Sequence, residues 1–264
     1  MRIVPVDSFR TLEGVDLGSG SVVPLDPPRV AVLASLDPSF GEMRFFLERE
    51  LEIPFTIVDP ENTRADLRDF NLLVLPSGVR DLDDWKESVR QFGQRGGTVV
   101  AMGGSASCLT RERSGLTAAT QSRPEDKDKD EDEDEDEDDE GWRTQADRQR
   151  ASRLDALPGS LFEVQLDPEH RLAFGLPERI PVLLTGSSMF RAGGGRAVGQ
   201  VATDRMLSGY ASTERREDVE GGYWVVEASL GRGRAVLFSE RPTYRMGFHG
   251  AMRALMNAFV IPRS

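Results

Sequence analysis

The sequence predicts an α/β fold, a three-layer sandwich in which a mostly parallel sheet lies between two layers of helices. The apolar run at residues 30–35 is typical of a strand that is covered on both faces, because it has no alternating polar positions. Similar short runs alternate with segments of helical periodicity up to about residue 110, which favours a parallel sheet with helical crossovers. In the second half, alternating patterns and a glycine turn indicate late antiparallel strands.

The first half contains four strand and helix pairs joined by short connections. Strands are expected at residues 30–35, 55–58, 72–75 and 98–102, and helices at 41–52, 63–70, 82–92 and from about Ser105. Ligands of parallel sheets bind beyond the carboxyl ends of the strands. We therefore expect a site to be built from the turns at 35–37, 59–60, 76–78 and 103–105.

The second half is expected to complete the same layered domain. A helix is predicted at 142–154, strands at 158–167, 182–184 and 197–201, a hairpin of 223–228 with 235–239 through Gly231–Gly233, and a closing amphipathic helix at 250–259.

The predicted organisation is an extended linker at 1–28 and one domain at 29–264, interrupted by a disordered acidic insert at about 119–141. Residues 125–140 hold 14 acidic residues and two lysines, which accounts for the whole net charge of −12. The remaining chain has 31 basic and 31 acidic residues. A neutral body beside a polyanionic run argues against nucleic acid as a partner. A solvated insert is favoured over a calcium-collecting or protein-binding role.

Targeting signals give little information on compartment. The sequence has no apolar run of membrane-spanning length and no signal peptide at its start, so no membrane partner is expected, although a longer parent protein could be exported. The single cysteine, Cys108, excludes an internal disulfide and leaves the compartment open.

Four phrases, taken in order, resemble the glutamine-amidotransferase-like domain at the C-terminal end of a subset of bacterial zinc carboxypeptidases, relatives of carboxypeptidase A. They are residues 72–78, 96–104, 158–175, and 231–238 followed by His249-Gly250. The resemblance implies a flavodoxin-like core of the class I amidotransferase type. It also implies that zinc and the peptidase chemistry belong to a preceding or partner peptidase domain.

Neither histidine of this chain opens a carboxypeptidase zinc motif, because His170 is followed by Arg-Leu-Ala and His249 by Gly-Ala-Met. No metal or cofactor is therefore expected in this chain. Active amidotransferases of this fold use a cysteine at a strand-to-helix elbow and a histidine after a late strand. The glycines of the elbow place Met102 at the cysteine position and Ser239 at the histidine position, which predicts a non-catalytic domain. Cys108 is expected to be a buried structural thiol.

An enzymatic alternative uses Ser105. The segment Gly103–Ser107 is similar to the elbow of peptidase E and cyanophycinase, serine peptidases of the same fold, and His249 is the better of two candidate bases. The competing interpretation is that Ser105 caps the following helix and that His249 is a capping or packing residue. His170 is expected to be exposed to solvent.

The favoured hypothesis is a non-catalytic accessory domain that accompanies a zinc carboxypeptidase and serves docking or the recognition of a small-molecule ligand. A third hypothesis is a sugar-binding module, because the chain also resembles inactive amidotransferase-like domains attached to glycosidases. The candidate ligand-binding residues share a position at strand ends or near the last helix: Ser77, Gly78, Gly103, Gly104, Ser105, Arg241 and His249.

Overall fold

The structure is a computed structural model that describes residues 25–61, 66–79, 82–122, 157–191 and 193–261, with residues 8, 10, 13–16 and 19 before them. Most of the predicted linker, the acidic run at 125–140 and the helix predicted at 142–154 lie outside the described residues. Residues 119–122, which the sequence assigns to the insert, lie inside the domain. Strand β5 (Thr120–Ser122) pairs there with β8 (Met189–Arg191), a pairing that the polar Thr-Gln-Ser sequence does not signal.

One half of the sheet is parallel, as predicted. Strands β1 (Val30–Leu33), β2 (Phe55–Val58), β3 (Leu72–Leu75) and β4 (Thr98–Met102) follow the order β2-β1-β3-β4, and β11 (Gly233–Phe238) pairs in parallel with β4. This order places the carboxyl ends of β1, β3, β4 and β11 at one edge of the molecule. The edge is therefore formed by segments that are far apart in the sequence.

The other half of the sheet is antiparallel. Beyond β11 the order continues with β10 (Tyr223–Leu230), β9 (Arg196–Ser208), β6 (Ser160–Leu166) and β7 (Arg179–Leu184). The predicted hairpin is the β10–β11 pair, and its turn contains Gly231 at φ +58°. The α/β fold with late antiparallel strands is thus confirmed.

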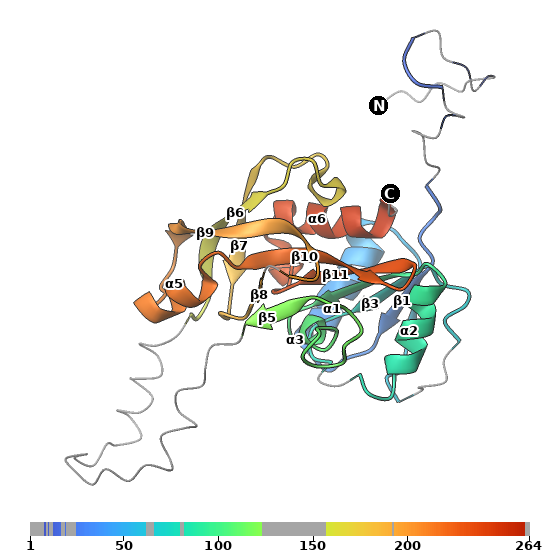
Figure 1. The fold of residues 1–264 in the computed structure, drawn as a ribbon, viewed down its shortest axis with the longest axis horizontal. Coiled ribbons are helices and arrows are strands. Elements are labelled where there is room, and N and C mark those ends of the chain that lie inside the picture. Colours follow the sequence, from blue (N-terminus) through green and yellow to red (C-terminus); the bar gives the residue numbers. More distant parts are fainter. Residues whose placement is uncertain are drawn as a thin grey trace.

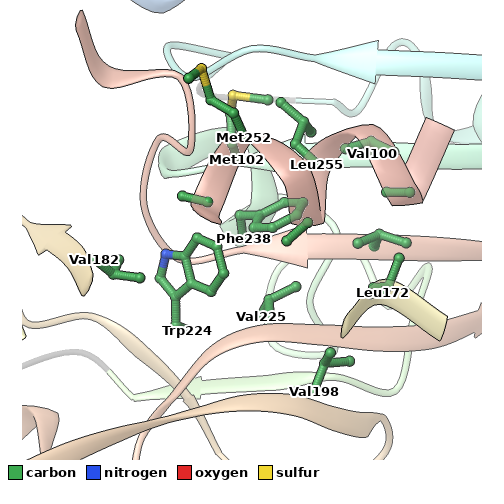
Figure 2. Close-up of a cluster of buried hydrophobic side chains, with 14 of the residues drawn as sticks. Val100, Met102, Leu172, Val182, Val198, Trp224, Val225, Phe238, Met252 and Leu255 are labelled. Carbon is green, nitrogen blue, oxygen red and sulfur yellow. The ribbon is translucent and has the colours of Figure 1, made fainter. Parts of the chain in front are cut away.

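Helices cover both faces of the sheet (Figure 1). The helix α1 (Pro38–Phe45), its π-helical extension at Phe46–Glu50 and α6 (His249–Val260) pack against one face, and α2 (Lys86–Gln94) and α3 (Gly104–Ser107) pack against the other. Neighbouring residues of β1 alternate between the two cores: Val30 and Val32 face the first, and Ala31 and Leu33 face the second. Figure 2 shows the first core, where Trp224 lies edge-to-face with Phe238 at a ring distance of 5.2 Å.

Some predicted elements are wrong or incomplete. The helix predicted at 63–70 is absent from its described part, 66–70, because the Asp66 carboxylate accepts a hydrogen bond from the Arg68 backbone N–H and holds a turn. The helix predicted at 82–92 begins only at Lys86, and the helix predicted from Ser105 is the single turn α3. The sequence analysis missed β5, β8 and α5 (Thr213–Val219), which are short.

Candidate functional site

The elbow after β4 has its strained residue at Gly103. Gly103 has φ 54° and ψ −132°, a combination that residues with a side chain adopt only at a cost. The strained residue of a strand-to-helix elbow is the one that presents a nucleophile in hydrolases. The structure thus places this position one residue later than predicted. Met102 is the last residue of the strand, and its side chain is fully buried in the core with Met252 nearby (Figure 2).

Ser105 is fully buried inside α3. Its hydroxyl donates a hydrogen bond to the Pro76 carbonyl and accepts one from the Val79 N–H at 3.0 Å. The expected helix cap is wrong, because Gly103 occupies the N-cap and the Ser105 hydroxyl instead ties α3 to the turn after β3. A serine nucleophile must donate its hydroxyl hydrogen to a general base. In Ser105 this hydrogen is already donated to the Pro76 carbonyl.

Cys108 directly follows α3 and is 4% exposed. Its thiol contacts the Val79 and Gly104 carbonyls at 3.3 and 3.5 Å. The geometry is that of a packed structural thiol, in agreement with the expectation from the sequence.

The two histidines lie in different surroundings. His249 is exposed at the first position of α6, and no hydrogen bond joins it to Ser105 in the part of the chain that the structure describes. His170 is 2% exposed, so its predicted exposure is wrong. Its Nδ1 accepts a hydrogen bond from the Leu172 N–H, and its Nε2 lies 4.0 Å from Glu227. Burial lowers the pKa of His170, with an opposing effect from Glu227.

A cavity of about 500 Å³, hereafter the edge cavity, lies at the carboxyl ends of the parallel strands. It brings together four of the predicted ligand-binding residues, Ser77, Gly103, Gly104 and Arg241. Gly78 lines an adjoining hollow of about 650 Å³, which shares Asp37 and Pro38 with the edge cavity. Ser105 and His249 line neither space.

Sequence reasoning missed eight of the thirteen residues that line the edge cavity. The missed residues are Asp37, Pro38, Ser107, Gln121, Thr185, Gly186, Ser188 and Glu240. Ser239 was named in the sequence analysis only as the residue at the position of the catalytic histidine, and not as a ligand-binding residue. Asp37 lies in one of the turns where a site was expected. Gln121 and Thr185 to Ser188 come from the antiparallel half, where no sequence rule places them beside β4.

Glu240 follows β11 directly, and its carboxylate is held by one residue of the antiparallel half. The Thr185 N–H donates to Oε1 at 2.8 Å and the Thr185 hydroxyl donates to Oε2 at 2.9 Å. Burial raises the pKa of Glu240 against the opposing effect of the bonds from Thr185 and of the Gly186 N–H. The carboxyl group is therefore fixed in orientation but electrostatically unfavourable in its charged form.

Arg241 lies between carboxylates on the other side of the edge cavity. Its Nη1 is 3.9 Å from Asp37 Oδ1 and 3.7 Å from Glu42 Oε1, and its guanidinium lies 5.0 Å from the centre of the Tyr244 ring. Asp37 also caps α1, because its carboxylate accepts the Ser39 N–H. The electrostatics of the cavity are thus set by side chains that also hold local structure.

Across the described ranges, no three His, Cys, Asp or Glu side chains come together as a set of metal ligands. The same residues include no helix that is long and apolar enough to span a membrane.

No protein-family model matches the sequence, and no curated protein matches it either. Solved structures match the fold. A glutamine amidotransferase from Thermotoga maritima aligns over 89% of this chain and 96% of its own, with a TM-score of 0.54 and 11% identity. A putative ThuA-like protein from Parabacteroides merdae aligns over 90% and 93%, with a TM-score of 0.55 and 13% identity.

A third match is the β-galactosidase from Bacillus circulans sp. alkalophilus, with a TM-score of 0.52 and 12% identity. The alignment covers 88% of this chain but only 30% of the β-galactosidase, so the chain spans about a third of that enzyme's length. At these identities the similarity establishes the fold alone: the chain has a mixed α/β fold of the class I glutamine amidotransferase type.

Proposed function

We propose that this chain is a non-catalytic amidotransferase-like domain that recognises a small polar molecule in the edge cavity and accompanies a zinc carboxypeptidase. The proposal has a chemical part, which concerns the elbow and the cavity, and a biological part, which concerns the partner. Each part has its own test.

The elbow is the observation that carries the non-catalytic role. The strained position is Gly103, which has no side chain to act as a nucleophile. Ser239, at the end of β11, is 7% exposed and its hydroxyl lies 3.6 Å from Met189 Sδ, so it supplies no base. The two positions that amide hydrolysis requires on this fold therefore carry groups that neither attack nor accept a proton.

The lining of the edge cavity supports ligand recognition. Its side chains are mainly hydroxyl, amide and charged groups, which orient a ligand through hydrogen bonds. The location also agrees with the general rule for sheets of this type, in which ligands bind beyond the carboxyl ends of the strands.

The association with a peptidase rests on the ordered sequence phrases that resemble carboxypeptidase-linked domains. The test is to sequence the open reading frame immediately upstream and to co-purify the protein that it encodes with this chain. An upstream zinc-peptidase domain that forms a stable complex with the chain supports the proposal. An unrelated neighbouring frame, together with no complex with the zinc carboxypeptidase of the same organism, contradicts it.

The serine-hydrolase alternative is tested by labelling with a fluorophosphonate. We expect no labelling of the full chain, because the Ser105 hydroxyl is buried and bonded to two backbone groups. We expect Ser105→Ala to unfold more easily by about 1–3 kcal/mol, since it leaves the Val79 N–H and the Pro76 carbonyl without their partner. Labelling that disappears in Ser105→Ala would establish the hydrolase instead.

A sugar-binding role is the second candidate, and the hydroxyl and amide groups of the edge cavity favour it. A thermal shift with one class of neutral sugar and none with peptides would support this role.

A further inference from the structure

Three charged side chains line the edge cavity, and their charges do not cancel. Asp37 and Glu240 are acidic and Arg241 is basic. Glu42 adds a third carboxylate close behind Arg241. Arg245, whose guanidinium lies 5.3 Å from the centre of the Tyr244 ring, adds a second cation on that side. The lining itself carries two carboxylates and one guanidinium, so the cavity favours cationic over anionic ligands.

Arg241 is not an ion-pair partner of Glu240, and its charge is the weakest of the effects that oppose the raised pKa of that carboxyl group. The ion-pair contacts of Arg241 are with Asp37 and Glu42, and its guanidinium is stacked over Tyr244. In the described part of the chain no basic side chain forms an ion pair with Glu240. Its donors are neutral: the hydroxyl and N–H of Thr185 and the Gly186 N–H. Each carboxylate oxygen accepts one bond from Thr185, and the carboxylate as a whole keeps acceptor capacity beyond its three donors.

A partly buried carboxylate without a cation costs free energy, and proteins retain such groups where they have a task. Thr185 holds the Glu240 carboxylate in one orientation at the wall of a cavity, which is the arrangement of a preorganised acceptor. The missing positive charge can then come from a ligand.

We propose that the edge cavity binds a small organic cation that carries an ammonium or guanidinium group, with Glu240 as its anchor. This inference rests on the proposed ligand-binding function and specifies the class of ligand. A volume of about 500 Å³ fits a small molecule. A bare metal ion fits poorly, because the described residues hold no cluster of three metal-ligating side chains.

The experiment compares probes that differ in charge but not in shape. Methylguanidinium is paired with methylurea, and n-butylammonium is paired with butanol and butyrate, in NMR titrations of the full chain at low salt. We expect each cation to bind at least tenfold more tightly than its neutral partner, with shifts at residues of the edge cavity. Butyrate is expected not to bind.

Glu240→Gln keeps the shape of the side chain and removes its charge. We expect it to lower the affinity for methylguanidinium at least tenfold, to the level of methylurea. The matched control is Glu217→Gln, which makes the same change at an exposed position of α5 and leaves the affinity unchanged. Thr185→Val, which removes one donor to the carboxylate, is expected to weaken binding several-fold.

The outcomes separate this inference from the proposed function. If neutral sugars or methylurea bind the edge cavity as tightly as the cations, or if the preference for cations survives in Glu240→Gln, the inference is overturned and the polar-ligand function stands. If neither these probes nor a panel of neutral sugars binds, both proposals are overturned. Circular dichroism of each variant verifies that it is folded.

Discussion

Glu227 and Glu240 are two partly buried carboxylates of the β10–β11 hairpin: Glu227 lies in the middle of β10, and Glu240 follows the end of β11. Glu227 is bonded to two arginines: Arg171 Nη2 lies 2.8 Å from one oxygen and Arg234 Nη1 lies 2.9 Å from the other. Among the described residues, the hydrogen-bond donors to Glu240 are the neutral groups of Thr185 and the Gly186 N–H, and its carboxylate faces a cavity. Burial acts on both groups, but Arg234 and Arg171 outweigh it at Glu227, so the pKa of Glu227 is lowered while that of Glu240 is raised.

The difference separates a structural carboxylate from a candidate binding carboxylate. Arg234 also donates to the Ala258 and Ile261 carbonyls at the end of α6, so the Glu227 cluster fastens the last helix to the sheet. The Glu240 carboxylate fastens only the turn at Thr185, and it leaves acceptor capacity towards the cavity. The following changes test this contrast, beginning with the largest expected effect.

Arg234→Met is expected to lower the free energy of unfolding by about 3–5 kcal/mol, because it leaves Glu227 with a single arginine and removes the donor to the Ala258 and Ile261 carbonyls. Urea denaturation measures the change. Arg216→Met, at an exposed position of α5, is the control and is expected to change stability by no more than about 0.5 kcal/mol. A loss as small as that of the control would show that the Glu227 cluster does not hold the structure.

Gly103→Ala is expected to cost about 1–3 kcal/mol, since its φ of +54° is unfavourable for alanine and the new Cβ would lie 2.8 Å from the Ser77 hydroxyl oxygen. Thermal unfolding measures the loss, and a second change, Ser77→Gly, should restore part of it. Gly104→Ala is the control one residue later, where nothing lies within 4 Å of the new Cβ. Equal effects at 103 and 104 would contradict the assignment of the strained elbow to Gly103.

Glu240→Gln is expected to stabilise the fold by about 1 kcal/mol at neutral pH, or to raise Tm by about 2–4 °C, because it removes a charge that burial disfavours. Differential scanning calorimetry measures the shift. The same substitution at Glu227 should destabilise, since Arg171 and Arg234 would lose their anionic partner. A loss of stability in both variants would remove the distinction between the two carboxylates.

The pH dependence of stability should differ in sign between the two carboxylates. Its amplitude is expected to be smaller than the effects of the substitutions above. Glu227 has a folded pKa below its ordinary value of 4.5, so its stabilising contribution is present above pH 4.5 and is lost as the pH falls through the lowered pKa. Glu240 has a folded pKa above 4.5, so its penalty is absent below pH 4.5 and grows as the pH rises through the raised pKa. Differences in stability between the wild-type chain and each Gln variant, measured from pH 3 to 8, should slope in opposite directions.

Much of the fold was predictable because its signals are local. The apolar runs at β1, β3 and β4 and the glycine turn of the β10–β11 hairpin each identify their own element. Local signals failed where a side chain competes with the helix, as Asp66 does, and where strands are as short as β5 and β8. The elbow was identified correctly but placed one residue early, because only the backbone angles show that Gly103 carries the strain.

The candidate site was predictable only on its parallel side. Ser77, Gly103 and Gly104 follow strands whose carboxyl ends must share an edge, and this rule needs only the order of the elements. Arg241 was singled out because arginines and aromatic residues gather after the predicted late strand. Glu240 and Thr185, separated by 55 residues, meet only because the antiparallel half folds back beside β11.

The amino-acid sequence by itself determined the layered α/β architecture, the parallel half of its sheet and the glycine-rich turn that follows β4. These properties follow from hydrophobic periodicity and from residue identity, which act over a few neighbouring positions. Tertiary structure alone decided that Ser105 and His170 are buried and that Glu240 lies at a cavity with no ion-pair partner among the described residues. Burial and electrostatic partners depend on chain segments that meet only when the core closes, and no local pattern encodes their distances.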